Sequence, residues 1–240
     1  MINARDRLIV ALDVERFEDA AELINELSRE VDIFKVGIGP FTGFGQEILQ
    51  KLETEDKKVF LDLKFHDIPN TVYNAACAGA RHGVSMMNFH CLGGRDMLKA
   101  AVKGAEEGCA EGVHEMPILL GVTILTSMGP EEMAEIGLTG EVEDKVIQLA
   151  ETAKQAGLDG VVASAKEART IKKRLGKDFI VVTPGVRPEW AAAGDQKRVL
   201  TPKQAMTEGA DYIVVGRPII KAADPAEAAR RIIEEMGEGF

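Results

Sequence analysis

Eight short apolar runs, separated by stretches with helical spacing, constrain the fold of this chain more than any other feature. Most runs are continuously apolar, as strands covered on both faces are, rather than alternating. The runs are Leu8–Leu12, Ile33–Ile38, Val59–Leu63, Ser85–Phe89, Ile118–Val122, Gly160–Ala163, Phe179–Val182 and Tyr212–Val215. Eight strands alternating with about eight helices predict an α/β fold, with one (β/α)8 TIM barrel domain over residues 1–240. A doubly wound sheet is the alternative, although it rarely needs so many regular units.

The segments between the runs carry helix signals. Apolar residues from Phe17 to Leu27 recur at helical spacing. Thr201-Pro202 and Asp224-Pro225 each have the order of an N-cap followed by a proline in the first turn. Glycines lie just before later runs, where helices commonly end: Gly83, Gly157 and Gly209.

Composition and charge exclude several classes of function. A net charge of −10, without a block of Lys or Arg, argues against a nucleic-acid-binding surface but leaves room for a small anionic ligand. Three cysteines without metal-ligand spacing indicate reduced thiols in a cytoplasmic protein. We expect no signal peptide, because the amino-terminal residues run straight into a strand. No apolar run approaches membrane-spanning length.

The third run leads into the most polar motif of the chain. Asp62, Lys64 and Asp67 follow one another at i, i+2 and i+5, where a strand gives way to a loop. Side chains two residues apart on a strand point to the same face, so Asp62 and Lys64 are expected to aim at one point. Burying unpaired charges is costly, whereas opposite charges keep one another ionised. The motif therefore predicts a functional site.

Polar residues recur at the carboxyl ends of the other runs, where the active site of such a barrel lies. They are Asp13, Lys35, His90, the segment Thr123–Ser127, the segment Thr183–Arg187, and Gly216-Arg217. The loops after strands 7 and 8 commonly form a phosphate site. Gly216 would let a backbone N–H approach an anion, and Arg217 could donate two parallel hydrogen bonds to a phosphate. The segment 186–201 is long enough to cover a bound phosphate as a lid.

Structural roles stay open for some of these residues taken singly. Asp13 also suits a helix or turn cap. Arg187 also suits a surface ion pair with Glu189 or Asp195. A purely structural role is less natural for Lys35, because a lysine inside an apolar strand is poor core material.

The histidines and hydroxyl residues are similarly ambiguous. A structural role, with their hydrogen bonds made within the protein, suits His66 and His90 better than acid–base catalysis. Thr123 suits packing within a strand. Thr126 and Ser127 fit helix caps and ligand contacts about equally well. None of these residues identifies a reaction by itself.

Taken together, the chain resembles the bacterial type of the orotidine 5′-phosphate decarboxylase family over nearly its whole length. The resemblance rests on Ala11-Leu12-Asp13, Phe34-Lys35-Val36-Gly37, the segment Asp62–Thr71, Leu125-Thr126-Ser127, the segment Thr183–Pro188, Gly194-Asp195-Gln196 and the segment Val215–Pro218. Related barrels share the Asp-x-Lys-x-x-Asp motif alone, but all seven segments in order are specific. Cys91 and Gly39 depart from the residues frequent in the family at their positions, and neither is a matched functional position.

The resemblance implies decarboxylation of orotidine 5′-monophosphate to uridine 5′-monophosphate, the last step of de novo pyrimidine nucleotide synthesis, without metal or cofactor. Lys64 would protonate C6 of the pyrimidine, Asp62 would lie next to the departing CO2, and Lys35 and Asp67 would complete an alternating charged array. The implied substrate-binding residues are Asp13, Lys35, Asp62, Lys64, Asp67, Ile68, Thr71, Thr126, Ser127, Pro184, Arg187, Gln196, Gly216 and Arg217. A homodimer is also implied, with Asp67 and Thr71 entering the active site of the neighbouring subunit.

Two alternative functions remain. The related barrels include Mg²⁺-dependent keto-gulonate-phosphate decarboxylases and hexulose-phosphate synthases, which carry a metal-binding Glu where this chain has Lys35. A lysine there repels a divalent cation. The other alternative is a catalytically silent barrel that only binds a nucleotide. The Asp62, Lys64 and Asp67 cluster argues against it, because binding alone needs no such costly group of charges.

Overall fold

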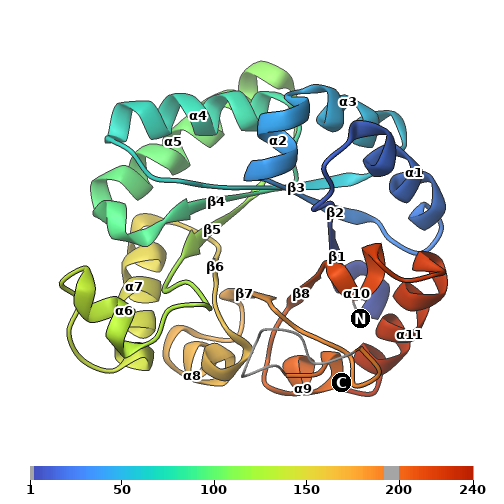
Figure 1. The fold of residues 1–240 in the computed structure, drawn as a ribbon. Coiled ribbons are helices and arrows are strands. Elements are labelled where there is room, and N and C mark those ends of the chain that lie inside the picture. Colours follow the sequence, from blue (N-terminus) through green and yellow to red (C-terminus); the bar gives the residue numbers. More distant parts are fainter. Residues whose placement is uncertain (1–2, 192–199, 240) are drawn as a thin grey trace. The chain divides into compact units, whose positions relative to one another are not determined.

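A computed structural model describes residues 3–191 and 200–239. Its eight parallel strands follow one another from β1 to β8 in a closed barrel, with helices between successive strands (Figure 1). The (β/α)8 fold predicted from the apolar runs is therefore confirmed.

The strands agree closely with the predicted runs. They are β1 Leu8–Ala11, β2 Ile33–Gly37, β3 Lys58–Phe65, β4 Met86–His90, β5 Ile118–Val122, β6 Gly160–Val162, β7 Ile180–Pro184 and β8 Tyr212–Val215. Three strands extend beyond the predicted ends into polar residues, so that Lys64 lies within β3, His90 within β4 and Thr183 within β7. Apolar content predicts the buried part of a strand but not how far its backbone pairing continues.

The helix predicted from Phe17 to Leu27 is confirmed as α1. The helices are α1 Phe17–Leu27, α2 Ile38–Phe44, α3 Glu47–Thr54, α4 Pro69–Arg81, α5 Gly94–Gly112, α6 Pro130–Glu135, α7 Val142–Ala156, α8 Ala165–Leu175, α9 Pro202–Thr207, α10 Arg217–Ile220 and α11 Pro225–Gly237, with 3-10 turns at Ala4–Arg7 and Cys91–Gly93. Thr201 and Asp224 cap α9 and α11 as predicted, each accepting a backbone hydrogen bond three residues on. The short helices α2, α6 and α10 were not predicted, since each is too brief to show a periodic pattern.

The chain forms two compact units, residues 1–63 with 185–240, and residues 64–184. In the first unit, β1 pairs with β2 and β8, and β2 pairs with β3. The register sets Gly37 opposite Asp62, so the ends of β2 and β3 lie level. In the second unit, β4, β5, β6 and β7 pair in sequence, with His90 opposite Val122.

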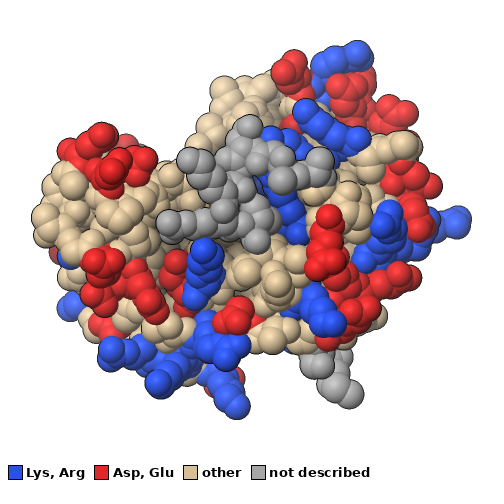
Figure 2. Space-filling view, turned by 60° about the horizontal axis from the view of Figure 1, so that its bottom comes forward, with Lys and Arg blue, Asp and Glu red and all other residues tan. Residues whose placement is uncertain are grey.

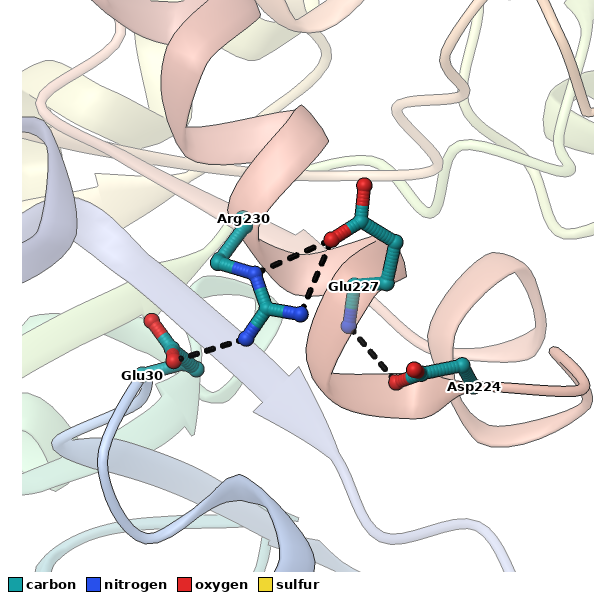
Figure 3. A network of polar contacts seen from close by, with 4 residues as sticks. All are labelled: Glu30, Asp224, Glu227 and Arg230. Atoms are coloured by element: carbon teal, nitrogen blue, oxygen red, sulfur yellow. Dashed lines mark hydrogen bonds and ion pairs between the residues drawn. The ribbon is translucent and has the colours of Figure 1, made fainter.

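Ion pairs on the surface of the first unit join segments far apart in sequence. Arg230 of α11 donates to Glu30, which follows α1, over 3.0 Å, and to Glu227 over 2.8 Å (Figure 3). Asp224 accepts the backbone N–H of Glu227, which fixes the first turn of α11. Exposed pairs of this kind contribute little stability individually.

The surface carries charged side chains of both signs, with a net charge of −10 for the whole chain. On the face drawn in Figure 2, acidic and basic side chains are interspersed. Within the described residues, none of the helices is both long and apolar enough to span a membrane.

Helices α4 and α5 of the second unit lie side by side and approach through glycines (Figure 1). A methyl group added at Gly104 would lie 2.2 Å from the carbonyl oxygen of Tyr73, and one added at Gly108 would lie 2.2 Å from that of Cys77. The obstructing atoms belong to the backbone of α4, so no side-chain rotation can relieve the overlap. We call Gly104 and Gly108 the glycine seam.

Gly108→Ala should lower the free energy of unfolding by about 1–3 kcal/mol, because the helices must separate or distort. This loss runs against the usual helix preference, which favours Ala over Gly by roughly 0.5–1 kcal/mol. Urea denaturation measures the change. Gly43→Ala is the matched control, since nothing lies within 4 Å of a methyl group added to Gly43 in α2. Unchanged stability of Gly108→Ala would contradict the tight seam.

Candidate active site

A buried lysine and two carboxylates form the centre of the site in the first unit. Lys35 and Asp62 are the only buried charged residues in the part of the chain that the structure describes. The Lys35 ammonium lies 3.2 Å from Asp13 Oδ1 and 3.4 Å from Asp62 Oδ2. Removing one member of such a group would leave an uncompensated buried charge, so the three groups hold one another in place.

The three members come from the first three strands, as predicted. Asp13 follows β1, Lys35 lies in β2 and Asp62 lies in β3. The N-cap of α1 is Arg16, so Asp13 does not cap that helix. Its side chain is 55% exposed, which leaves it accessible to a ligand beside the buried Lys35.

Gly37 provides the space that the Lys35 ammonium occupies. A methyl group added at Gly37 would lie 2.8 Å from Lys35 Nζ and 3.5 Å from Asp13 Oδ1. The φ angle of Gly37 is −87°, which any residue adopts, so the backbone itself does not require glycine there. The requirement comes from the ammonium group.

Gly37→Ala should therefore reduce catalysis far more than stability. The methyl group would displace only the end of a flexible side chain, yet a shift of about 1 Å in a charged group can reduce the rate by roughly 100-fold. We expect kcat/KM to fall by about 10- to 100-fold with little change in the melting temperature. The control is Gly39→Ala, whose added methyl group meets nothing within 4 Å. Equal activity of the two variants would refute the role given to Gly37.

Of the residues predicted to bind phosphate, Gly216 lies beside this cluster. Gly216 is the N-cap of α10, and a methyl group added to it would lie 3.7 Å from Asp13 Oδ2. Arg217 begins α10 and is exposed. The backbone N–H of Arg187 donates to the Leu200 carbonyl over 3.1 Å. Gln196 and half of the expected lid, residues 192–199, lie outside the described residues.

Lys64 has an unusual backbone in the second unit. Its φ angle is +49°, in the left-handed region that non-glycine residues rarely adopt, although it lies within β3. Such a conformation costs roughly 1–3 kcal/mol and persists only when its surroundings impose it. The alternation rule of a regular strand therefore does not by itself fix where the Lys64 side chain points.

Asn88 in β4 accepts the Lys64 backbone N–H through Oδ1 over 2.7 Å. This residue is completely buried and was not among the predicted site residues. The sequence did offer a signal for Asn88, an amide side chain within an apolar strand. Buried polar groups are nearly always hydrogen-bonded, so such a residue is expected to have a specific partner. What the sequence could not show is its partner, which lies 24 residues away.

The turn from β3 to α4 presents three predicted residues to solvent. Asp67, Ile68 and Thr71 are all exposed, and Ile68 is 66% exposed despite its apolar side chain. Asp67 Oδ1 accepts the backbone N–H of Ile68 over 2.6 Å. The turn thus presents a carboxylate and an apolar side chain on the surface of the second unit.

His66 and His90 stack on one another, with ring centroids 5.2 Å apart. Burial lowers the pKa of His90, and electrostatic interaction with the nearby His66 and Lys64 side chains lowers it further. His90 is therefore neutral near pH 7, which lets its Nδ1 accept the backbone N–H of Leu92 over 3.4 Å. This local bond gives His90 a structural role, in line with the interpretation favoured from the sequence.

Of the polar residues that follow β5, one is buried and two are exposed. The Thr123 hydroxyl donates to the Val162 carbonyl over 3.0 Å, which confirms its packing role. Thr126 and Ser127 are exposed and do not cap α6, whose N-cap is Gly129. The structure therefore excludes capping of α6 for these two residues, and ligand contact stays a prediction.

At the end of β7, Pro184 is partly exposed. Its neighbour Thr183 is 1% exposed, and the Thr183 hydroxyl has no hydrogen-bond partner within the described residues. A buried hydroxyl of this kind is unusual and lies next to a predicted substrate contact.

Within residues 3–191 and 200–239, no group of three or more His, Cys, Asp or Glu side chains is arranged to hold a metal ion. The three cysteines are free and buried. Burial raises the pKa of Cys91 to about 12, so its thiol stays protonated at neutral pH.

Comparison with known proteins gives consistent matches along the chain. Residues 6–232 match the family model described as Orotidine 5'-phosphate decarboxylase / HUMPS family. The orotidine 5′-phosphate decarboxylase of Heliobacterium modesticaldum is 48% identical over 240 residues, covering 100% of this chain and 99% of that protein. The orotidine 5′-phosphate decarboxylase of Syntrophotalea carbinolica is 49% identical over 236 residues, covering 98% of this chain and 97% of the relative.

Solved structures agree with the sequence comparison. The crystal structure of orotidine 5′-phosphate decarboxylase from Lactobacillus acidophilus has a TM-score of 0.85 and 40% identity, and covers 96% of this chain and 99% of that chain. The structure of the protein with the same name from Pyrococcus horikoshii has a TM-score of 0.76 at 26% identity, with 96% and 99% covered.

Proposed function

The chain belongs to the orotidine 5′-phosphate decarboxylase / HUMPS family, and we propose that it converts orotidine 5′-monophosphate to uridine 5′-monophosphate and CO2. Curated relatives carry the name of this decarboxylase, a carboxy-lyase of pyrimidine biosynthesis. The observation that carries the proposal is the Lys35 ammonium between Asp13 and Asp62, with Lys64 two residues further along the same strand as Asp62. We further propose that residues 1–240 act as one barrel domain in the cytoplasm.

The chemical difficulty is a carbanion at C6 of the pyrimidine. The bond from C6 to the carboxylate breaks, CO2 leaves, and the electron pair stays on C6 without a π-system to receive it. The ammonium of Lys64 stabilises this charge and transfers a proton to C6. Lys64 then regains a proton from solvent. Fixed charge takes the place of an electron-accepting cofactor.

Repulsion between Asp62 and the substrate carboxylate is too weak to carry the reaction alone. Two unit charges ~4 Å apart at an effective dielectric of ~20 repel one another by roughly 4 kcal/mol, which corresponds to about three orders of magnitude in rate. The largest enzymatic accelerations require ~20 kcal/mol or more. Most of the effect must come from stabilising the carbanion and from phosphate binding energy used to organise the site.

Phosphate binding is assigned to Arg187, Gln196, Gly216 and Arg217, and contacts with the base to Thr126, Ser127 and Pro184. Asp13 and Lys35 would contact the ribose. Exposure of Asp13, Arg217, Thr126 and Ser127 supports these roles, because each can reach a ligand without unfolding its surroundings.

We assign Asp67, Ile68 and Thr71 to the active site of a neighbouring subunit in a homodimer. Their exposure, and that of the apolar Ile68 and Leu92, is what an interface would cover. Mixing Lys64→Ala and Asp67→Ala proteins tests this arrangement. If Asp67 acts across the interface, each mixed dimer has one intact site and activity returns. Two inactive parents that stay inactive after subunit exchange would exclude it.

A metal-free reaction distinguishes the proposal from its Mg²⁺-dependent relatives. The Lys35 ammonium lies between two carboxylates, where it would repel a divalent cation. We therefore expect full activity in the presence of a chelator.

An absorbance assay tests the function directly. Purified protein is mixed with orotidine 5′-monophosphate, with and without EDTA, and loss of the orotate chromophore is followed. Rapid loss that EDTA does not affect supports the proposal. Binding without loss would indicate a silent barrel, and activity only without EDTA would indicate the metal-dependent reaction type.

A further inference from the structure

Among the described strand residues, Lys64 alone has a positive φ angle. Two other non-glycine residues with positive φ, Asp56 and Val113, have ordinary explanations. Asp56 lies in the turn after α3, and Val113 is the C-cap of α5. Left-handed residues are common at such ends but not within strands. The conformation of Lys64 therefore needs a local cause.

The hydrogen-bond partner of the Lys64 backbone N–H lies in β4. The Asn88 side chain is completely buried, and its Oδ1 accepts the Lys64 N–H over 2.7 Å. In a regular sheet, a backbone carbonyl of the neighbouring strand would accept this N–H. A side-chain acceptor takes that role here, which leaves the backbone at Lys64 free to turn away from strand geometry while its N–H stays satisfied.

Only the oxygen of the amide can make this contact, because the Lys64 N–H is a donor. An asparagine also brings no net charge. It can hold the backbone of a lysine without forming an ion pair with the ammonium of the same residue. Asparagine thus holds the backbone of the lysine without adding a charge of its own.

We propose that Asn88 is a positioning residue for Lys64: by accepting its N–H, Asn88 fixes the left-handed backbone and so directs the Lys64 ammonium. Backbone conformations of this kind cluster where function depends on them. The inference rests on the proposed function, because it assumes that Lys64 acts on the substrate. Asn88 itself need not touch the substrate.

Two substitutions separate positioning from packing. Asn88→Leu has a similar size but no acceptor, whereas Asn88→Asp keeps an oxygen acceptor. For Asn88→Leu we expect kcat to fall about 100-fold while KM changes by less than about threefold, since only the reacting group is misplaced. The kcat of Asn88→Asp should be at least about tenfold higher than that of Asn88→Leu. Loss of general packing would instead alter KM, kcat and folding together.

Thr123→Val is the matched control. It removes another buried hydrogen bond, from the Thr123 hydroxyl to the Val162 carbonyl in the neighbouring pair of strands, and should keep normal kcat. If Thr123→Val loses as much kcat as Asn88→Leu, or if Asn88→Leu keeps normal kcat, the positioning role is overturned.

Amide hydrogen exchange at Lys64 provides a readout that does not need turnover. The Lys64 N–H should be protected in the wild-type protein and in Asn88→Asp, and should exchange much faster in Asn88→Leu. If Asn88→Leu fails to fold, an unprotected Lys64 N–H in the wild-type protein still overturns the proposal. If the wild-type protein does not decarboxylate its substrate but shows this exchange pattern, the contact stands and the proposed function fails.

Discussion

Lys64→Ala should reduce decarboxylation by ~10⁴-fold or more while leaving uridine 5′-monophosphate binding measurable. The substitution removes both the proton donor and the cation that stabilises the carbanion, effects that amount to about 10²–10⁴-fold and about 10²–10³-fold respectively in other enzymes. Product carries no carbanion, so its affinity depends mainly on the phosphate and base contacts. Turnover by the absorbance assay and product binding by calorimetry measure the two quantities separately.

Lys58→Ala is the matched control, because Lys58 begins the same strand, β3, and is exposed. It should retain full turnover. Near-normal turnover of Lys64→Ala would exclude Lys64 as the proton donor. Loss of product binding together with turnover would point to a collapsed site rather than to a missing proton donor.

Arg217→Ala should damage reaction of the phosphorylated substrate far more than reaction of the bare nucleoside. Hydrogen bonds to a charged group contribute about 1.5–3 kcal/mol each, so loss of a two-pronged contact should reduce kcat/KM for the nucleotide by roughly 10²–10⁴-fold. Orotidine has no phosphate for Arg217 to bind, and its slow reaction should change little. The ratio of kcat/KM values for nucleotide and nucleoside is the measurement.

Arg230→Ala controls for the loss of an arginine from the same unit. Arg230 engages Glu30 and Glu227 on the surface rather than a predicted substrate group (Figure 3). Its removal should leave the substrate ratio unchanged. If Arg217→Ala lowers kcat/KM equally for both substrates, Arg217 does not bind the phosphate.

The sequence predicts the barrel well because buried parallel strands are continuously apolar, and β5 and β8 have the predicted ends. It also predicts that Asp13, Lys35 and Asp62 share a site, since strand ends in such a barrel meet at one face. The pairing of Lys35 with both carboxylates follows from that placement.

The features that the sequence does not reveal depend on contacts between distant segments. The left-handed backbone of Lys64 and its bond to Asn88 involve two strands, and nothing local in either strand requires them. The need for glycine at position 37 arises from the reach of the Lys35 side chain. Regular periodicity predicts strands, but departures from regularity at a site are set by tertiary structure.

The glycine seam also limits how the gene can change. Every glycine codon begins with two guanines, so a single-base substitution is either silent, a stop, or adds a side chain with a Cβ atom. At Gly104 and Gly108 that atom would meet the backbone of α4, which no compensating side-chain change on α4 can move aside. We therefore expect only synonymous substitutions to be tolerated at codons 104 and 108. Codons 39 and 43, where an added Cβ meets nothing within 4 Å, should accept substitution by alanine.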